Sequence, residues 1–364
     1  MDKVARLSAA ERRELFRETA ARRGMSPAVI EKDFWVCWVL KQLFAEPELK
    51  DRMVFKGGTT LSKVFGLIDR FSEDIDLVLD WQLLGYGAGQ EDPYQEFDSI
   101  SKRDRFNKAV NQKAAQYIAA TLIHDLNRMV TRCPQVVAAV DADDPHAVNI
   151  FYPASFSEDY LHPKVLLEIG PLASWVPSAD RAGAGLAQTC EEIGPLASWV
   201  PSARHTIQPY AAEVFPKVFI EPACQVVVIS AERTFWEKAT ILHQQAHRTG
   251  AMPSRYSRHY YDFYKLASSP IRASAIADLK LLRDVVAFKQ RFYPCGWAKY
   301  EDAVPGSLKL IPGDANLAEL RRDYRSMAVM IHGQIPDFDK IIDTLGLLEK
   351  QINQLAPDRA DETP

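Results

Sequence analysis

The stretch FKGGTTLSKVFGLIDRFSEDIDLVL, residues 55–79, decides how the rest of the chain is organised. Two adjacent glycines, Gly57 and Gly58, follow a short apolar segment, and the acids Asp74 and Asp76 lie two residues apart further on. Side chains of a strand alternate between its faces, so a strand over 72–79 places both carboxylates on one face and the aliphatic residues between them in a core. Neighbouring carboxylates repel each other unless a divalent cation lies between them. A glycine turn that lets the backbone approach phosphate, beside such a pair, predicts metal-assisted phosphoryl or nucleotidyl transfer.

The composition is that of an ordinary globular protein and favours neither a membrane nor a nucleic-acid partner. The chain has 364 residues, enough for two or three domains, of which 47% are hydrophobic and 25% charged. Because the net charge is −4, a nucleic acid has to be bound by a local basic patch. The five cysteines include no CxxC pair, and the first residues lack the apolar core of a signal peptide. With no long uncharged apolar run either, we expect reduced thiols, a cytoplasmic location and no membrane span.

The pattern of short apolar segments and longer amphipathic ones predicts an α/β (or α+β) fold, a small mixed sheet flanked by helices and followed by a helical C-terminal domain. We expect three parts: N-terminal helices packed on the core over 1–50, a catalytic core over 51–230, and the helical domain over 231–364. The expected strands are 53–55, 72–79, 147–152, 164–169 and 224–229. The expected helices are 8–23, 27–44, 59–65, 102–130, 231–248, 258–267, 274–291, 317–331 and 338–355, the second and fifth of them capped by Ser26 and Ser230.

One segment, EIGPLASWVPSA, occurs twice, letter for letter, at 168–179 and at 192–203. Identity over this length exceeds structural convergence, and two copies are too few for a solenoid. We interpret the region 168–203 as a tandem duplication in the DNA, whose Ala- and Gly-rich middle loops out. An additional functional element is the less favoured alternative.

The duplication bears on the third acid that metal sites for triphosphate chemistry usually take from a neighbouring strand. The strand expected over 164–169 offers Glu168, and Val165, Leu166 and Leu167 give it the apolar character of a central strand. Glu192 begins the second copy and is the alternative, but the residues before it do not form an apolar strand. We therefore favour Glu168.

Basic side chains are also needed, because charge develops on the leaving pyrophosphate. Lys238 and Arg233 lie on the helix after the last expected strand, and Arg258 and Lys265 flank Asp262 on the next helix. Each of these, taken alone, is more commonly a solvated surface charge. A basic run on the long helix is a candidate for RNA binding, although a solvated helix face is favoured; it comprises Lys102, Arg103, Arg105, Lys108 and Lys113.

Three other site hypotheses are disfavoured. His243 and His247 have zinc-like spacing, but the HExxH pattern is absent. The sequence GGTTLSK lacks the lysine–serine order of a P-loop, and GTTLS does not match the GxSxG nucleophile elbow.

Three motifs taken together resemble the AbiEii toxin family. They are the Gly-Gly-Thr turn followed by RFSEDIDL at 70–77, ERTFWEKATILH at 232–243, and RHYYDFY at 258–264. The family comprises nucleotidyltransferase-like toxins of abortive-infection, type IV toxin–antitoxin systems. It is related to the MenT toxins and belongs to the DNA polymerase β-like nucleotidyltransferase superfamily. The resemblance covers about residues 30–266 and makes the region 51–230 the nucleotidyltransferase core.

The resemblance also implies roles for individual residues. The phosphates of the nucleotide would be held by Gly57, Gly58 and Thr59, with Arg70 and Ser72 as further contacts beside the metal turn. Mg²⁺ would be bound by Asp74 and Asp76, with Glu168 as the third acid. Lys238 would contact the triphosphate, and Asp262 would complete the catalytic set. The spacing from Gly58 to Asp74 is at the long end of the superfamily pattern.

The activity implied by the resemblance is transfer of a nucleotide from an NTP to an RNA 3′ end. The expected acceptor is tRNA, and a cognate antitoxin encoded nearby and a role in phage defence are expected with it. Two other hypotheses are an antibiotic-type nucleotidyltransferase of a small molecule and a catalytically inactive nucleotide-binding protein that acts on a partner. The intact acids at 74 and 76 argue against the last.

Overall fold

The computed structural model describes residues 1–72, 74–87, 95, 97–156, 162–170 and 201–355. The chain divides into two compact units. Among the described residues, the sheet unit comprises those within 1–64, 71–170 and 202–229, and the helical unit comprises those within 65–70, 201 and 230–355. Each unit is therefore built from segments that are separated in the sequence. The expected three-part division at residues 50 and 230 stays a prediction.

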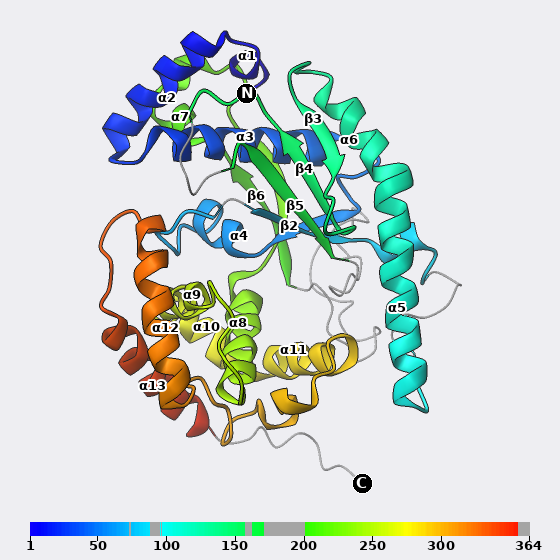
Figure 1. The fold of residues 1–364 in the computed structure, drawn as a ribbon, viewed down its shortest axis with the longest axis vertical. Helices are drawn as coiled ribbons and strands as arrows, with labels where there is room; N and C mark the ends of the chain where they lie inside the picture. Colours follow the sequence, from blue (N-terminus) through cyan, green and yellow to red (C-terminus); the bar gives the residue numbers. More distant parts are fainter. Residues whose placement is uncertain (73, 88–94, 96, 157–161, 171–200, 356–364) are drawn as a thin grey trace. The chain divides into compact units, whose positions relative to one another are not determined.

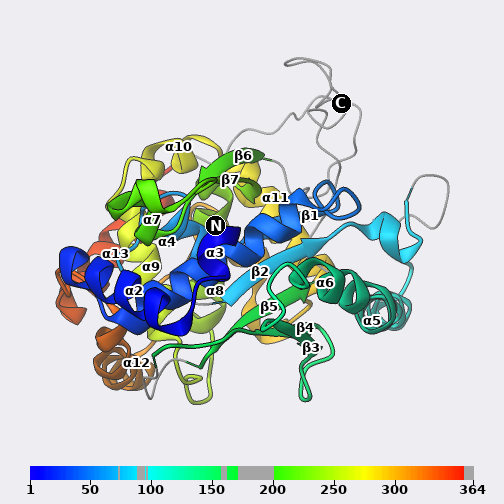
Figure 2. The ribbon, with the colours of Figure 1, turned by 90° about the horizontal axis from the view of Figure 1, so that it is seen from above.

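The sheet unit is built on a mixed sheet, as the sequence predicts, with seven strands among the described residues. They are β1 (Met53–Lys56), β2 (Asp74–Leu79), β3 (Val137–Val140), β4 (Ala147–Phe151), β5 (Lys164–Gly170), β6 (Ser202–Ile207) and β7 (Cys224–Ile229), in the order β3-β4-β5-β2-β1-β7-β6. The pairs β2–β5 and β1–β7 are parallel, and the others are antiparallel. The sheet is larger than expected because β3 and β6 at its edges were not predicted. β2, which carries both acids, lies in the middle of it (Figures 1 and 2).

The described part of the sheet unit also contains seven α-helices. They are α1 (Asp2–Ala5), α2 (Ala9–Arg23), α3 (Pro27–Ala45), α4 (Gly58–Lys63), α5 (Ile100–Tyr117), α6 (Ile123–Val130) and α7 (Tyr210–Val214). α3 begins after the Ser26 cap, as predicted, and packs on β5 and β7 with its large aromatic residues buried. The long helix expected over 102–130 is α5 and α6 joined by a π-helical turn at Ile118–Leu122, a widening that residue periodicity does not predict. Short 3₁₀ turns lie at Trp81–Leu84 and Pro216–Val218.

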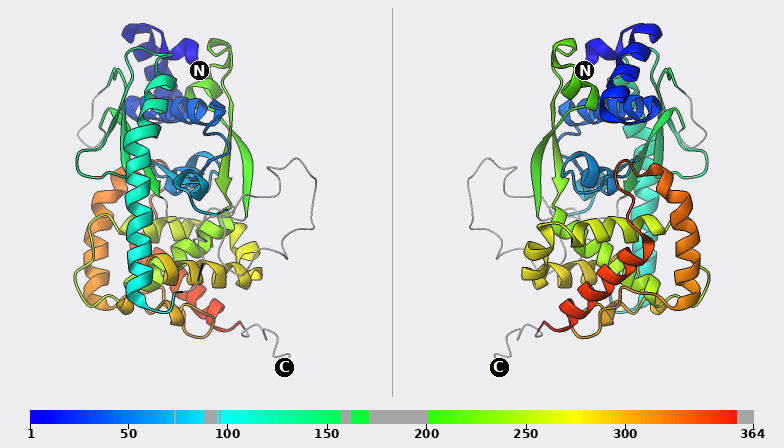
Figure 3. Two further views of the ribbon diagram at one scale, coloured as in Figure 1. Left: turned by 90° about the vertical axis from the view of Figure 1, so that its right-hand side faces the viewer. Right: turned by 90° about the vertical axis from the view of Figure 1, so that its left-hand side faces the viewer.

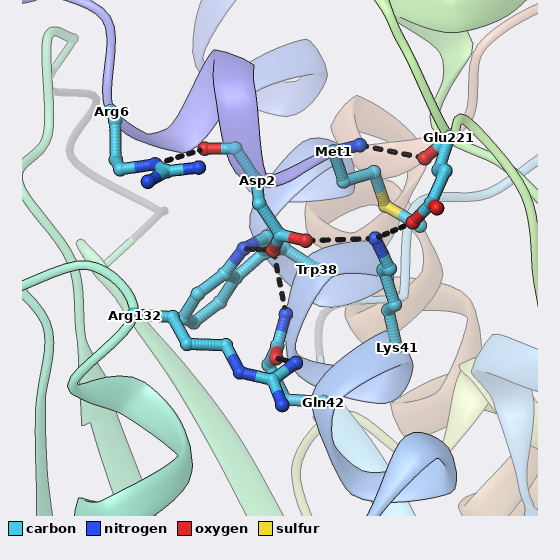
Figure 4. A network of polar contacts seen from close by, with 8 residues as sticks. All are labelled: Met1, Asp2, Arg6, Trp38, Lys41, Gln42, Arg132 and Glu221. Atoms are coloured by element: carbon cyan, nitrogen blue, oxygen red, sulfur yellow. Dashed lines mark hydrogen bonds and ion pairs between the residues drawn. The ribbon is translucent and has the colours of Figure 1, made fainter.

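A polar network fixes α1 to α3 (Figure 4). The Asp2 carboxylate accepts hydrogen bonds from Trp38 Nε1 at 2.9 Å, Gln42 Nε2 at 2.9 Å and Lys41 Nζ at 2.8 Å. Gln42 in turn accepts one from Arg132 Nη1 at 2.9 Å. Because Trp38 and Gln42 are buried, their polar atoms need these partners, and the network satisfies them.

The helical unit is built around two central helices, α8 (Ala231–Ala246) and α9 (Ser257–Ala267). α8 packs on α9, α10 (Ile271–Ala277) and α11 (Leu279–Phe292), whereas α9 also packs on α12 (Asp314–Met327) and α13 (Phe338–Asn353), shown from two sides in Figure 3. The single helix expected over 274–291 is wrong: α10 ends at Ala277, and Asp278 caps α11 by accepting a hydrogen bond from Leu281 N. Short 3₁₀ turns lie at Gly296–Ala298, Tyr300–Asp302 and Ala328–Met330.

None of the helices in the described part of the chain has the length and apolar character needed to cross a membrane.

Candidate active site

The glycine turn lies between β1 and α4 and has a backbone conformation that only glycine adopts readily. Gly57 has φ +86° and ψ −163°. A Cβ placed on Gly57 would lie 1.8 Å from Asp76 Oδ2, so the Asp76 carboxylate occupies the space that any other side chain would need. The two predicted elements of the site, the glycine turn and the second acid, are therefore in direct contact.

Two threonines of α4 fix this turn to the neighbouring backbone. Thr59 Oγ1 donates a hydrogen bond of 2.5 Å to the carbonyl oxygen of Asp74, and Thr60 Oγ1 donates one of 2.7 Å to the carbonyl oxygen of Gly57. Both threonines are buried. The Thr59 hydroxyl therefore links the turn to the first residue of β2, and its expected phosphate contact stays a prediction.

The acids lie on one face of the sheet, which we call the acidic face. The burial pattern of β2 leaves Asp74 and Asp76 partly exposed and buries Ile75 on the opposite face, as the alternation predicts. Asp76 pairs with Glu168 of the parallel strand β5, and residues paired in register share a face. The sheet thus brings Glu168 beside Asp76, whereas Glu192 lies outside the described residues.

The carboxylates of the acidic face do not form a preformed metal cage. Among the described residues, no three histidine, cysteine or acidic side chains come close enough to hold one ion. Mg²⁺ commonly uses one or two carboxylates and completes its shell with water and substrate phosphates. The pair Asp74 and Asp76 meets that requirement, because both project from one strand on the same face. The chemistry of these donors therefore fits Mg²⁺.

The sequence reasoning missed one basic residue on this face. Lys56, the last residue of β1, pairs in register with Asp76, so Lys56, Asp76 and Glu168 form one row across three neighbouring strands. A signal was available in the motif itself, since the lysine directly precedes Gly57 and directly follows the strand expected over 53–55. Its position was not recognised because the direction of β1 relative to β2 is not visible in the sequence.

A buried ion pair between Lys63 of α4 and Asp33 of α3 holds α4 in place. Lys63 Nζ lies 2.6 Å from Asp33 Oδ1, and each side chain is 5% exposed. Asp33 Oδ2 also accepts a hydrogen bond from Tyr210 N at 2.7 Å, and Lys63 Nζ lies 3.6 Å from the centre of the Tyr210 ring. Burial works to lower the pKa of Lys63, but Asp33 outweighs it and the pKa lies above its ordinary value. The ion pair therefore holds the C-terminal end of α4 to α3.

The helical unit contains the other predicted catalytic residues as a buried charge cluster. The Asp262 carboxylate accepts hydrogen bonds from Arg70 Nε at 2.6 Å, Arg70 Nη2 at 2.7 Å and Lys238 Nζ at 2.8 Å. Lys238 Nζ also lies 3.1 Å from His259 Nδ1. Sequence reasoning named Arg70, Lys238 and Asp262 separately, and the structure brings them together. It did not single out His259, which precedes Asp262 by three residues and so lies on the same side of α9.

Electrostatics within this cluster follow from two cations sharing one carboxylate. Burial works to raise the pKa of Asp262, but Arg70 and Lys238 outweigh it and hold the pKa well below its usual range. Burial lowers the pKa of Lys238, and the attraction of Asp262 offsets this only partly because Arg70 opposes it. The cluster therefore carries an excess of positive charge in a buried place, which suits the binding of an anion.

The remaining predicted residues have local partners or stay predictions. Ser72, next to β2, is half-buried. Lys265 pairs with Asp69 at 2.8 Å, and Arg233 pairs with Glu237 at 3.1 Å. In the basic run of α5, Lys102 pairs with Asp98 at 2.7 Å, and Lys113 lies over the ring of Tyr86 at 4.0 Å. Binding of RNA by α5 stays a prediction.

His243 is a structural residue. Its Nδ1 accepts a hydrogen bond from Lys309 N at 3.0 Å, so its Nε2 carries the proton and donates to the carbonyl oxygen of Lys299 at 2.8 Å. Both ring nitrogens are used, which excludes His243 as a metal ligand in this conformation. These contacts agree with the sequence analysis, which disfavoured a zinc role for His243 and His247.

Comparison with known proteins agrees with the motifs. The family model described as the nucleotidyl transferase AbiEii toxin of type IV toxin–antitoxin systems matches residues 38–184 and 191–344. Among solved structures, the nucleotidyltransferase toxin MenT4 of Mycobacterium tuberculosis H37Rv is similar at 16% sequence identity and a TM-score of 0.39, covering 95% of this chain and 97% of that chain. No curated protein matches the chain. The family model spans most of the chain, including the glycine turn, both acids, Lys238 and Asp262, and the protein therefore belongs to the AbiEii family of nucleotidyltransferase toxins of type IV toxin–antitoxin systems.

Proposed function

We propose that this protein transfers a nucleotide from an NTP to the 3′ end of a tRNA, that it uses Mg²⁺, and that an antitoxin encoded nearby restrains it. Under this proposal it acts in the cytoplasm and in defence against phage. The observation that supports it best is the contact between Asp76 and Gly57, because this contact holds one of two paired carboxylates against a glycine turn.

The residues of the acidic face have distinct tasks in this proposal. Asp74 and Asp76 hold Mg²⁺, which when bound lowers the pKa of the attacking 3′-hydroxyl and stabilises charge on the phosphates. Thr59 keeps Asp74 in place through the hydrogen bond to its carbonyl oxygen. Glu168 adds a third negative charge beside Asp76 in the same row of the sheet.

The charge cluster of the helical unit binds the triphosphate in this proposal. Arg70 already satisfies both oxygens of Asp262, so the charge of Lys238 is only partly neutralised within the protein. A buried ammonium group with residual charge stabilises the negative charge that develops on the leaving pyrophosphate. Protein catalysis of nucleotidyl transfer requires little beyond this stabilisation and the positioning of the reactants.

Incubation of the protein with each labelled NTP, Mg²⁺ and total RNA tests the proposal. We expect label on tRNA, loss of transfer on addition of EDTA, and loss of transfer in Asp76→Ala with an unchanged melting temperature. Asp143→Ala, an exposed acid between β3 and β4, is the matched control and should retain activity. Activity that survives Asp76→Ala would contradict the metal site, and label recovered only on added small molecules would contradict the RNA acceptor.

A further inference from the structure

His259 is the part of the charge cluster to which the proposed chemistry gives no task. Its Nδ1 lies 3.1 Å from Nζ of Lys238. A lysine ammonium group has only donors, so in this contact Nδ1 is the acceptor and carries no proton. His259 is therefore neutral, with its proton on Nε2, and faces Lys238 with a lone pair.

The surroundings of His259 keep it in that neutral form. The groups that face it are Lys238 from α8, Arg258 and Asp262 from α9, and Arg70 from the loop before β2, while the Tyr256 ring packs edge-on at 5.0 Å. Three of these groups are cations and one is an anion. Burial, and then Lys238 and Arg258, lower the pKa of His259 well below its ordinary value.

Lys238 needs a second acceptor because Asp262 is shared. Both oxygens of Asp262 already accept hydrogen bonds from Arg70, so Asp262 alone fixes the lysine poorly. A lysine side chain loses rotamer entropy when it is held in one place, so one shared acceptor is a weak restraint. Asp262 Oδ2 and His259 Nδ1 together occupy two of the three N–H groups of Lys238, and among the described residues the third has no partner. The third N–H group is therefore not used by the described part of the protein, on a side chain that is 9% exposed.

We propose that His259 is a positioning residue, which holds Lys238 so that its remaining N–H group contacts the triphosphate of the NTP. The inference rests on the proposed function for the identity of the anion. The inference also requires that the second acceptor for Lys238, at the position of His259, is neutral. A carboxylate at this position would cancel the residual charge of Lys238, and a protonated histidine would repel Lys238. Protonation of His259 therefore releases Lys238.

Two substitutions and a control separate positioning from a general structural role. His259→Asn keeps an acceptor, since the amide oxygen can accept from Lys238, whereas His259→Leu removes it at similar size. His124→Leu, the same change at an exposed position of α6, is the matched control. We expect His259→Leu to raise KM for the NTP on the order of tenfold to a hundredfold, the effect of losing one hydrogen bond to a charged group. His259→Asn should remain within a few-fold of the wild type, and His124→Leu should be unchanged.

Nuclear magnetic resonance of protein labelled with ¹⁵N at histidine and lysine tests the geometry without any turnover. We expect His259 to show the Nε2–H tautomer and to become protonated only well below the ordinary histidine pKa near 6.5. The Lys238 ammonium signal should broaden or shift in His259→Leu and stay close to the wild type in His259→Asn. If the wild type transfers no nucleotide, the proposed function fails, and these signals still decide the inference.

Several results would overturn the role of His259. They are an Nδ1–H tautomer in the wild type, a Lys238 signal that is the same in His259→Leu as in the wild type, and a kinetic defect in His259→Asn as large as in His259→Leu. If His259→Leu fails to fold, the tautomer in the wild type and the Lys238 signal in His259→Asn remain decisive.

Discussion

Substitution of Gly57 by alanine is predicted to displace the Asp76 carboxylate. The new Cβ would lie 1.8 Å from Asp76 Oδ2 and 2.7 Å from Asp76 Cγ, and both distances are below any real contact. The turn is held in place by the hydrogen bond that Thr60 Oγ1 donates to the carbonyl oxygen of Gly57. The side chain of Asp76 must therefore rotate away from the position that it has in the structure.

The magnitude has two parts that a double-mutant cycle separates. A non-glycine residue at φ +86° and ψ −163° costs about 1–3 kcal/mol of unfolding free energy. Moving Asp76 off its rotamer adds about 0.5–1.5 kcal/mol. In an Asp76→Ala background the second part disappears, so Gly57→Ala should cost less there by about that amount. The expected difference between the two backgrounds, about 0.5–1.5 kcal/mol, is mostly larger than the error of about 0.3–0.5 kcal/mol with which independent substitutions add.

Urea denaturation and nucleotidyl transfer together test this prediction. Transfer by Gly57→Ala should fall about a hundredfold, since a misplacement of about 1 Å is enough for that loss. The control is Gly24→Ala in the same unit, where φ is +65° and nothing lies within 4 Å of the added Cβ. It should cost about 1–2 kcal/mol and leave transfer unchanged. Equal costs of Gly57→Ala in the two backgrounds, or full activity of Gly57→Ala, would refute the reasoning.

Three further predictions concern charged and titratable residues. Lys63→Met should lower the unfolding free energy by about 3–5 kcal/mol in urea denaturation, because it leaves Asp33 buried without its cation; a loss below 1 kcal/mol would contradict this. The pKa values of His243 and His259 are lowered by burial, so their neutral forms stabilise the fold above about pH 6.5, and this stability is lost as the pH falls below that value. The melting temperature should fall between pH 7 and pH 5, and less steeply in His259→Asn. Lys56→Met should tighten Mn²⁺ binding about threefold to tenfold in electron paramagnetic resonance titrations, because it removes a positive charge from the row of acids; weaker binding would show that the lysine helps to hold the ion.

The sequence predicted those strands and helix ends whose formation depends on residues close to one another in the chain. The strand Cys224–Ile229 and the Ser230 cap of α8 follow from a run of β-branched residues and a capping serine, and the structure has both. Of the two edge strands that were not predicted, β3 reads VAAV and is apolar throughout, so only β6 lacks an apolar pattern. β6, which reads SARHTI, has mostly polar or half-exposed residues and is held to β7 by backbone pairing, which leaves no apolar signal.

In the candidate site, too, the sequence predicts what one strand determines but not how strands and helices pair. Asp74 and Asp76 share a face through alternation within one strand, which the sequence contains. The register that aligns Glu168 and Lys56 with Asp76 is set by tertiary pairing and is invisible in the sequence. The contact of Arg70 with Asp262 joins residues 192 positions apart. The residues around each of them do not indicate that the two side chains pair.

The placement of Arg70 also has a consequence for the order in which the protein is made. The segment Phe65–Arg70 belongs to the helical unit, although the residues on both sides of it belong to the sheet unit. At roughly 5–20 residues per second, a ribosome adds Asp262 roughly 10–40 s after Arg70, given their separation of 192 residues. For nearly all of that interval the nascent chain contains the glycine turn and both acids of β2, but Arg70 lacks the carboxylate that neutralises it. A chain that a stalled ribosome releases before residue 262 therefore lacks the completed charge cluster. The cluster of Arg70, Lys238 and Asp262 is complete only late in translation.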